Sequence, residues 1–66
     1  MQRMMLEELK KEVEAFLVSE RMSATALGRE AVSDPNFVHD LRKGREPRFK
    51  TVRAVTSFMQ RKQKGD

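Results

Sequence analysis

The sequence predicts an all-helical fold of four short helices in a single domain. Apolar residues recur at intervals of three and four, which is the spacing of an α-helix, and the strict apolar–polar alternation of strands is missing. Pro35, Gly44 and Pro47 divide the chain into short segments. A chain of 66 residues has room for one domain and buries only a thin core, too small to enclose a deep substrate pocket.

The first helix is expected from about Met4 to Glu20. Glu7 and Glu8 lie near its start, where the positive end of the helix dipole stabilises carboxylates. One face of this helix carries the apolar residues Met5, Leu6, Leu9, Val13, Phe16 and Leu17.

A second helix is expected from Ala24 to Ala31 or Val32, because Ser23 is a favourable N-cap residue. Gly28 lies inside this helix, where glycine costs about 1 kcal/mol relative to alanine. We therefore expect the next helix to approach Gly28 closely, since a Cβ atom there would clash.

The third helix is expected from Pro35 to Lys43, with Asp34 as its N-cap and Gly44 as the left-handed residue after its end. Its apolar side would consist of Phe37, Val38 and Leu41. Its opposite, polar side would carry Asn36, His39, Asp40 and Lys43.

The fourth helix is expected from about Phe49 to Arg61. Its apolar stripe would consist of Val52, Val55, Phe58 and Met59. The predicted domain spans residues 1–60, and residues 61–66 are expected to form a frayed polar tail.

The charge is unevenly distributed along the chain. Residues 1–20 hold three basic and five acidic side chains, whereas residues 42–64 hold nine basic side chains and one acidic one. This asymmetry favours a polyanionic partner for the C-terminal half, and a merely solvated basic surface is the alternative. A membrane-surface role is disfavoured, because Gly44 and Pro47 interrupt the basic stretch.

The composition disfavours several other classes of protein. Cysteine is absent and there is a single histidine, so the chain has no disulfide framework and no thiolate or multi-histidine metal site. It shows no transmembrane run and no export signal, and we expect a cytoplasmic protein. We also expect no cofactor, no small-molecule ligand and no enzymatic activity, because no nucleophile–base pair or phosphate-binding loop is present.

The second and third helices together form a candidate helix-turn-helix, two short helices joined by about three residues. A tight crossing of the two suits the small residues Ala24, Ala26, Gly28 and Ala31. The third helix would be slender enough to enter a major groove about 12 Å wide, with its N-terminal end at the base edges.

A specific pattern of residues accompanies this arrangement. Ser23 stands at the cap, Leu27 four residues later, Gly28 and Arg29 directly after it, and the third helix reads Val38-x-x-Leu41-x-x-Gly44. Pro47 and the Val52/Val55 helix follow. Over roughly residues 4–60 the chain resembles the Cro/C1-type (XRE-like) helix-turn-helix domain of phage and bacterial repressors, which implies a lambda-repressor-like DNA-binding fold.

Two positions depart from the family pattern. Val32 and Ser33 stand where many members have glycine in the tight turn. Pro35 stands where members often place a polar residue that reads bases, which moves the implied base contacts to Asn36, His39 and Asp40.

The resemblance implies roles for individual residues. Asn36 would bond to adenine, Asp40 would accept from the amino group of cytosine, Phe37 would contact a thymine methyl group, and His39 would join them at the bases. The implied phosphate contacts are Ser23, Thr25, Arg42, Lys43, Arg45 and Arg48.

Each of these assignments has a simpler alternative. Asn36 and His39 are alternatively solvated surface residues, and Phe37 is as well interpreted as a core residue. Asp40 would alternatively pair with Arg42 or Lys43 on the surface.

These observations favour a sequence-specific regulator of transcription, a dimeric (auto)repressor that binds a palindromic operator in double-stranded DNA. The dimer contacts are expected at Phe58 and Met59, with Met5 and Leu9 behind them. The alternative is a small helical protein-interaction module, an antitoxin-like or phage-encoded adaptor, that uses the first helix and the Val52/Val55/Met59 stripe as its binding face.

Overall fold

The structure is a computed structural model that describes residues 6–64. Within this range it contains four α-helices and no strand, which confirms the predicted all-helical class. The helices are α1 (Leu6–Glu20), α2 (Ala24–Val32), α3 (Phe37–Arg42) and α4 (Phe49–Lys64). Of the residues assigned to the first helix and the dimer contacts, Met4 and Met5 lie outside the described range.

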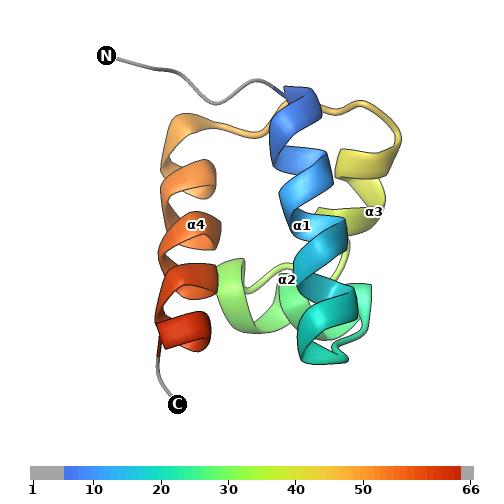
Figure 1. Cartoon of the computed structure of the whole chain (residues 1–66). Helices are drawn as coiled ribbons and strands as arrows, with labels where there is room; N and C mark the ends of the chain where they lie inside the picture. The colour runs from blue at the N-terminus through green and yellow to red at the C-terminus, as the bar shows by residue number, and fades with distance from the viewer. Residues whose placement is uncertain (1–5, 65–66) are drawn as a thin grey trace.

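The helices surround one core. α1 and α4 run in the same direction, α2 crosses below them, and α3 lies on the other side of α1 from α4 (Figure 1). α2 contacts both α3 and α4, and α1 contacts α3. α2 therefore connects α3 to α4, and α3 packs in turn against α1.

The core consists entirely of apolar side chains. No polar or charged side chain is buried among the described residues, so the core is held by the hydrophobic effect and by packing. The rings of Phe16 and Phe58 lie 6.1 Å apart and tilted, which joins α1 to α4. The buried apolar side chains of the core are Leu9, Val13, Phe16, Leu17, Leu27, Phe37, Val38, Leu41, Val55, Phe58 and Met59.

The first three helices each end at a residue in the left-handed region. These residues are Arg21 (φ 55°), Ser33 (φ 57°) and Gly44 (φ 95°). After α1, the Met22 amide donates to the Leu17 carbonyl at 3.0 Å, a six-residue closure that helices commonly use to end. Gly44 was predicted for this role, whereas Arg21 and Ser33 adopt it despite the Cβ atom that makes it unfavourable.

The start of α3 differs from the prediction. The helix begins at Phe37 rather than Pro35, and Asp34 is not its N-cap. Instead, the Phe37 amide donates to the Asp34 carbonyl at 3.1 Å, which makes residues 34–37 a β-turn. Asn36 has φ −95° and ψ 0°, the values of a type I turn, and its amide donates to Asp34 Oδ1 at 3.0 Å. The carboxylate therefore stabilises the turn, and only six residues remain for the helix.

The end of α4 also differs from the prediction. The helix continues to Lys64, three residues beyond the expected Arg61, so the segment expected to fray is helical as far as it is described. Arginine, lysine and glutamine are good helix formers, and no glycine or proline interrupts them before Gly65.

The chain that follows α2 approaches Gly28 closely, as the position of this glycine inside a helix predicted. A Cβ atom at this position would overlap the carbonyl oxygen of Asp34 and would lie 3.2 Å from Phe37 Cβ. The Asp34 amide also donates to the Gly28 carbonyl at 3.0 Å. The missing side chain thus lets the turn between α2 and α3 lie directly on α2.

Candidate nucleic-acid interface

The structure places the start of α2 beside the middle of α3. Ser23 caps α2 as predicted, because its Oγ accepts from the Ala26 amide at 3.0 Å. Thr25, in the first turn of α2, has its Oγ1 3.4 Å from Nε2 of His39, within hydrogen-bonding distance. Two residues assigned to phosphate and to bases, 14 positions apart, therefore lie together at one surface.

The outer side of α3 is polar and accessible. Asn36 is exposed, and its side-chain amide makes no capping hydrogen bond. Lys43 is exposed at the other end of the helix, and His39 and Asp40 are half-buried between them. The outer side therefore offers hydrogen-bonding groups at both ends and in the middle.

The inner side of α3 forms part of the core. Phe37, Val38 and Leu41 are buried there, as the apolar spacing predicted. Phe37 is only 6% exposed, so the structure gives its ring a packing role, and we do not carry it forward as a contact to thymine.

Arg42 is held by a residue of α1. Its Nε donates to Glu14 Oε2 at 2.7 Å and its second terminal nitrogen to Oε1 at 3.0 Å, so the pair is bidentate. The hydrogen bond from Arg42 lowers the pKa of Glu14, and partial burial opposes this effect. Arg42 therefore ties α3 to α1, and its charge is partly neutralised before any phosphate contact.

Asp40 has a partner that the sequence analysis did not consider. Its Oδ2 lies 3.2 Å from the terminal nitrogen Nη1 of Arg45, rather than near Arg42 or Lys43. The Arg45 side chain is 75% exposed and that of Asp40 30% exposed, so the pair lies at the surface.

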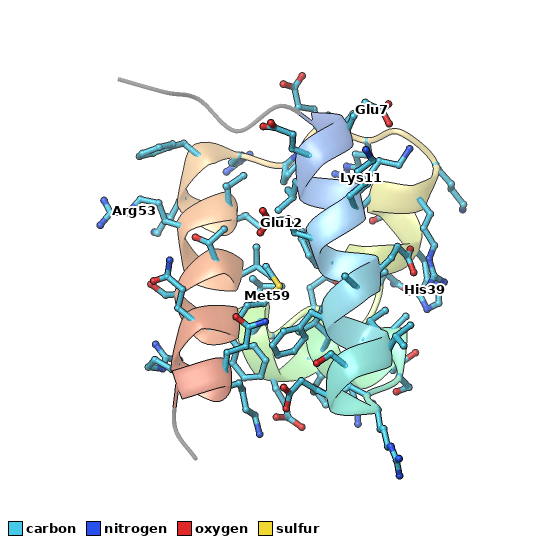
Figure 2. All side chains as sticks on the ribbon, viewed as in Figure 1. Glu7, Lys11, Glu12, His39, Arg53 and Met59 are labelled. Carbon is cyan, nitrogen blue, oxygen red and sulfur yellow. The ribbon has the colours of Figure 1, made fainter. Side chains whose placement is uncertain are left out.

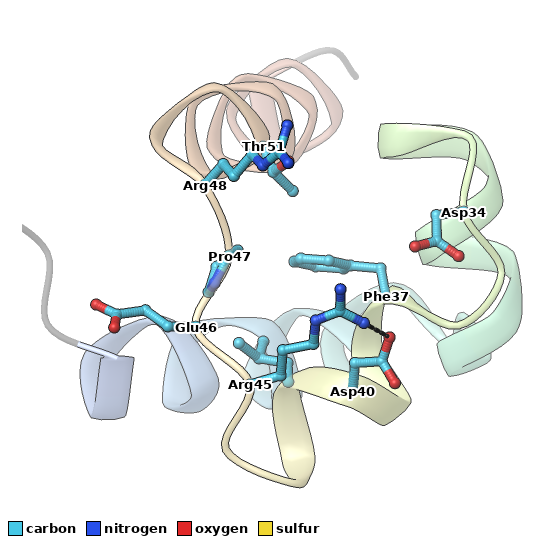
Figure 3. A pocket seen from close by; sticks show the side chains of 9 residues that line it. Asp34, Phe37, Asp40, Arg45, Glu46, Pro47, Arg48 and Thr51 are labelled. Atoms are coloured by element: carbon cyan, nitrogen blue, oxygen red, sulfur yellow. Dashed lines mark hydrogen bonds and ion pairs between the residues drawn. The ribbon is translucent and has the colours of Figure 1, made fainter.

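A cleft of about 330 Å³ opens between α3, the following loop and the start of α4. Figure 3 shows the Asp40–Arg45 pair at its edge, beside the ring of Phe37, with Arg48 and Thr51 across from them. The cleft is a surface feature made by the α3–α4 loop and not a pocket enclosed by the core. Its walls mix charges of both signs with apolar groups: Asp34, Phe37, Asp40, Leu41, Arg45, Glu46, Pro47, Arg48 and Thr51.

The basic side chains of the C-terminal half do not form one patch. Arg53 on α4 and His39 on α3 project from opposite sides of the molecule (Figure 2). Arg53 lies over the exposed ring of Phe49 at 5.8 Å, and Lys62 lies over Phe58 at 5.9 Å. Only part of the basic excess in the sequence therefore lies near α3.

The residues expected at a dimer contact are used inside the monomer. Leu9, Phe58 and Met59 are 2%, 8% and 6% exposed. A core this small must bury the apolar face of every helix, so few apolar side chains remain for a contact with a second copy. These side chains offer almost no surface to a second copy, and we do not carry them forward as an interface.

Sequence reasoning missed two features of this surface. Glu14 is 28 residues away from Arg42, so no local pattern signals their pairing. The ion pair between Asp40 and Arg45 depends on the left-handed Gly44, which the sequence did predict. A left-handed glycine brings together the residues on its two sides, so the spacing of Asp40 and Arg45 around Gly44 could have indicated the pair.

No group of three or more acidic, histidine or cysteine side chains within residues 6–64 is placed to hold a metal ion. None of the helices in that range is both long enough and apolar enough to cross a membrane.

Comparisons with protein-family models, with curated proteins and with solved structures found no match to this chain.

Proposed function

We propose that this protein is a sequence-specific DNA-binding regulator that inserts α3 into the major groove. The observation that carries the proposal is the arrangement of α2 and α3. α3 buries Phe37, Val38 and Leu41 against the core and leaves the opposite side of a six-residue helix accessible. A helix held in this way suits entry into a groove about 12 Å wide.

The polar groups on the accessible side fit distinct roles. The exposed side-chain amide of Asn36 suits adenine, and Asp40 and His39 lie one turn further along the helix. Lys43, Arg45 and Arg48 follow α3 and are exposed, which suits phosphates beside the groove. The N-terminal end of α2 adds Thr25 and the hydroxyl of the N-cap Ser23, which remains able to donate while its oxygen accepts.

Residues 6–64 contain one such unit, so we propose that two copies of the protein occupy a palindromic site and repress by occlusion. Half-sites would lie about 34–36 Å apart, one helical turn of DNA. Because Leu9, Phe58 and Met59 are buried, the proposed contact between copies would use other residues of the surface.

The proposal is tested by selecting bound sequences from a random duplex library and measuring affinity by fluorescence anisotropy across salt concentrations. We expect a preferred sequence and an affinity that falls steeply with salt. Asn36→Ala is expected to weaken binding by about 1–3 kcal/mol at one base position. Gln60→Ala, which removes an exposed amide from α4, is the matched control and should leave binding unchanged.

A matched pair of arginine variants tests the surface itself. Arg48→Ala should weaken binding to all duplexes and reduce the salt slope, because it removes a phosphate contact. Arg53→Ala removes the same charge on the side opposite His39 and should have little effect. Equal effects of the two variants, or binding without sequence preference, would contradict the proposed surface.

The alternative, a small helical protein-interaction module, has less support. Val55 and Met59 of its expected binding face are buried within the monomer. Within residues 6–64 the exposed large apolar residues are Val18 and Phe49, at 79% and 75%, near the end of α1 and at the start of α4. Single exposed apolar residues are common on protein surfaces.

A further inference from the structure

The contact between Asp40 and Arg45 is set by the backbone. The Arg45 amide donates to the Asp40 carbonyl at 3.1 Å and the Gly44 amide to the Leu41 carbonyl at 3.0 Å, across the left-handed Gly44. This closure brings the side chains of the first and last residues together, and an apolar contact usually forms there. Here the two side chains are an aspartate and an arginine, which pair at 3.2 Å.

Arg45 therefore has an anionic partner before it meets DNA. A carboxylate presents the same kind of oxygen acceptor to a guanidinium as a phosphate does. Because the closure already fixes both backbones, the pair loses less conformational entropy than a pair formed between mobile segments. In the free protein the Asp40 carboxylate occupies the place that a phosphate would take on Arg45.

Near DNA the pair has a further reason to stay closed. In isolation an exposed ion pair contributes little to stability, because water and salt screen it. If Arg45 leaves Asp40 for a phosphate, however, the carboxylate remains without a partner beside a polyanion, where like charges repel. Arg45 moves without this penalty only where Asp40 gains another donor, and the amino group of cytosine is such a donor.

We propose that Asp40 holds Arg45 away from the phosphates of non-cognate DNA. Arg45 is released to a phosphate only where the amino group of a cytosine replaces Arg45 as the hydrogen-bond donor to Asp40. This inference rests on the proposed function, because it concerns how the same surface discriminates between sequences. Asp40 would then determine specificity twice: it accepts from a base, and it controls a cation that binds any sequence.

The experiment measures the slope of log affinity against log salt for a random-sequence duplex that contains no preferred site. Asp40→Asn removes the charge that holds Arg45, so we expect the slope to steepen by about 0.9, the value for one additional phosphate contact. Asp40→Asn combined with Arg45→Gln should return the slope to that of the original protein. Arg45→Gln alone should leave the slope unchanged. If Arg45 made an ordinary phosphate contact on this duplex, the same substitution would reduce the slope by about 0.9.

Glu46→Gln is the matched control, since it removes an exposed carboxylate next to Arg45 that has no ion pair among the described residues. A slope in Asp40→Asn equal to that of the original protein, or the same steepening in Glu46→Gln, would overturn the inference while the proposed function stands. If the original protein binds no duplex, the proposed function fails, and the inference fails with it. Circular dichroism of each variant establishes that the helices are intact.

Discussion

Arg42, the last residue of α3, holds Glu14 of α1 through two hydrogen bonds of 2.7 and 3.0 Å. The pair adds a polar link between the helix proposed to enter DNA and the first helix of the bundle. Both side chains are nearly half exposed, so water and salt screen the interaction.

The first prediction concerns the pH dependence of this pair. The contact lowers the pKa of Glu14 from its ordinary value of 4.5, so its contribution to stability is present above that value and is lost as pH falls through the lower folded pKa. Glu14→Gln should reduce the free energy of unfolding by about 0.2–1 kcal/mol at pH 7. The difference from the original protein should disappear in strong acid, as measured by urea denaturation at several pH values.

Glu12→Gln is the control for this prediction, because Glu12 is an exposed carboxylate on the same helix with no ion pair among the described residues. An equal loss of stability in both variants would assign the effect to the net charge of α1 and not to Arg42.

The second prediction concerns Gly28. Gly28→Ala should gain helix propensity but should destabilise the protein overall by about 1–3 kcal/mol, because the new Cβ overlaps the carbonyl of Asp34 and forces the turn away from α2. Thermal unfolding would measure this loss. Ser57→Ala, at an exposed position of α4, makes a comparable change in propensity without a clash and should be close to neutral. A stabilised Gly28→Ala variant would mean that the turn can move freely.

The third prediction concerns Ser33 and its left-handed backbone. Ser33→Gly should stabilise the protein by about 0.5–1 kcal/mol, because it relieves the Cβ strain at φ 57° and that relief exceeds the added entropy of the unfolded chain. Ser33→Ala keeps the strain and should give no gain. Chemical denaturation of the two variants side by side distinguishes relief of strain from loss of the hydroxyl group.

The fourth prediction concerns Phe58. Because its ring packs against Phe16 in the monomer core, Phe58→Ala should lose about 3–5 kcal/mol of stability. The loss should be the same at all protein concentrations. Stability at a dimer interface would instead rise with concentration, so denaturation at two well-separated concentrations tests whether Phe58 belongs to the core or to an interface.

Much of the fold followed from patterns within single helices. The apolar spacing identified the buried faces of α1 and α3, and Ser23 and Gly44 marked two helix ends correctly. Such features are local, because a cap or a left-handed glycine acts on the backbone within a few residues. The end of α4 was placed too early because composition was interpreted as fraying, although the residues there favour a helix.

The errors arose where two local structures competed or where distant segments met. Asp34 can cap a helix or stabilise a turn, and Pro35 fits both, so the sequence did not decide between them. Apolar residues of α1 and α4 were assigned to a dimer contact, although the core of the monomer uses them. How much apolar surface a small core needs depends on the whole fold, so the pattern of a single helix does not reveal it. The pair between Glu14 and Arg42 joins positions 28 apart, and no spacing rule reaches that far.

Among the described residues no polar or charged side chain is buried, so shape and volume alone restrict which side chains occupy the core. Apolar residues of similar size exchange with little loss under those conditions. Over evolutionary time we therefore expect relatives of this chain to diverge readily at the eleven buried apolar positions of the core and to keep a glycine where α2 meets the turn. Distant homologues would then be recognised more reliably by that one small residue than by the identity of their interior.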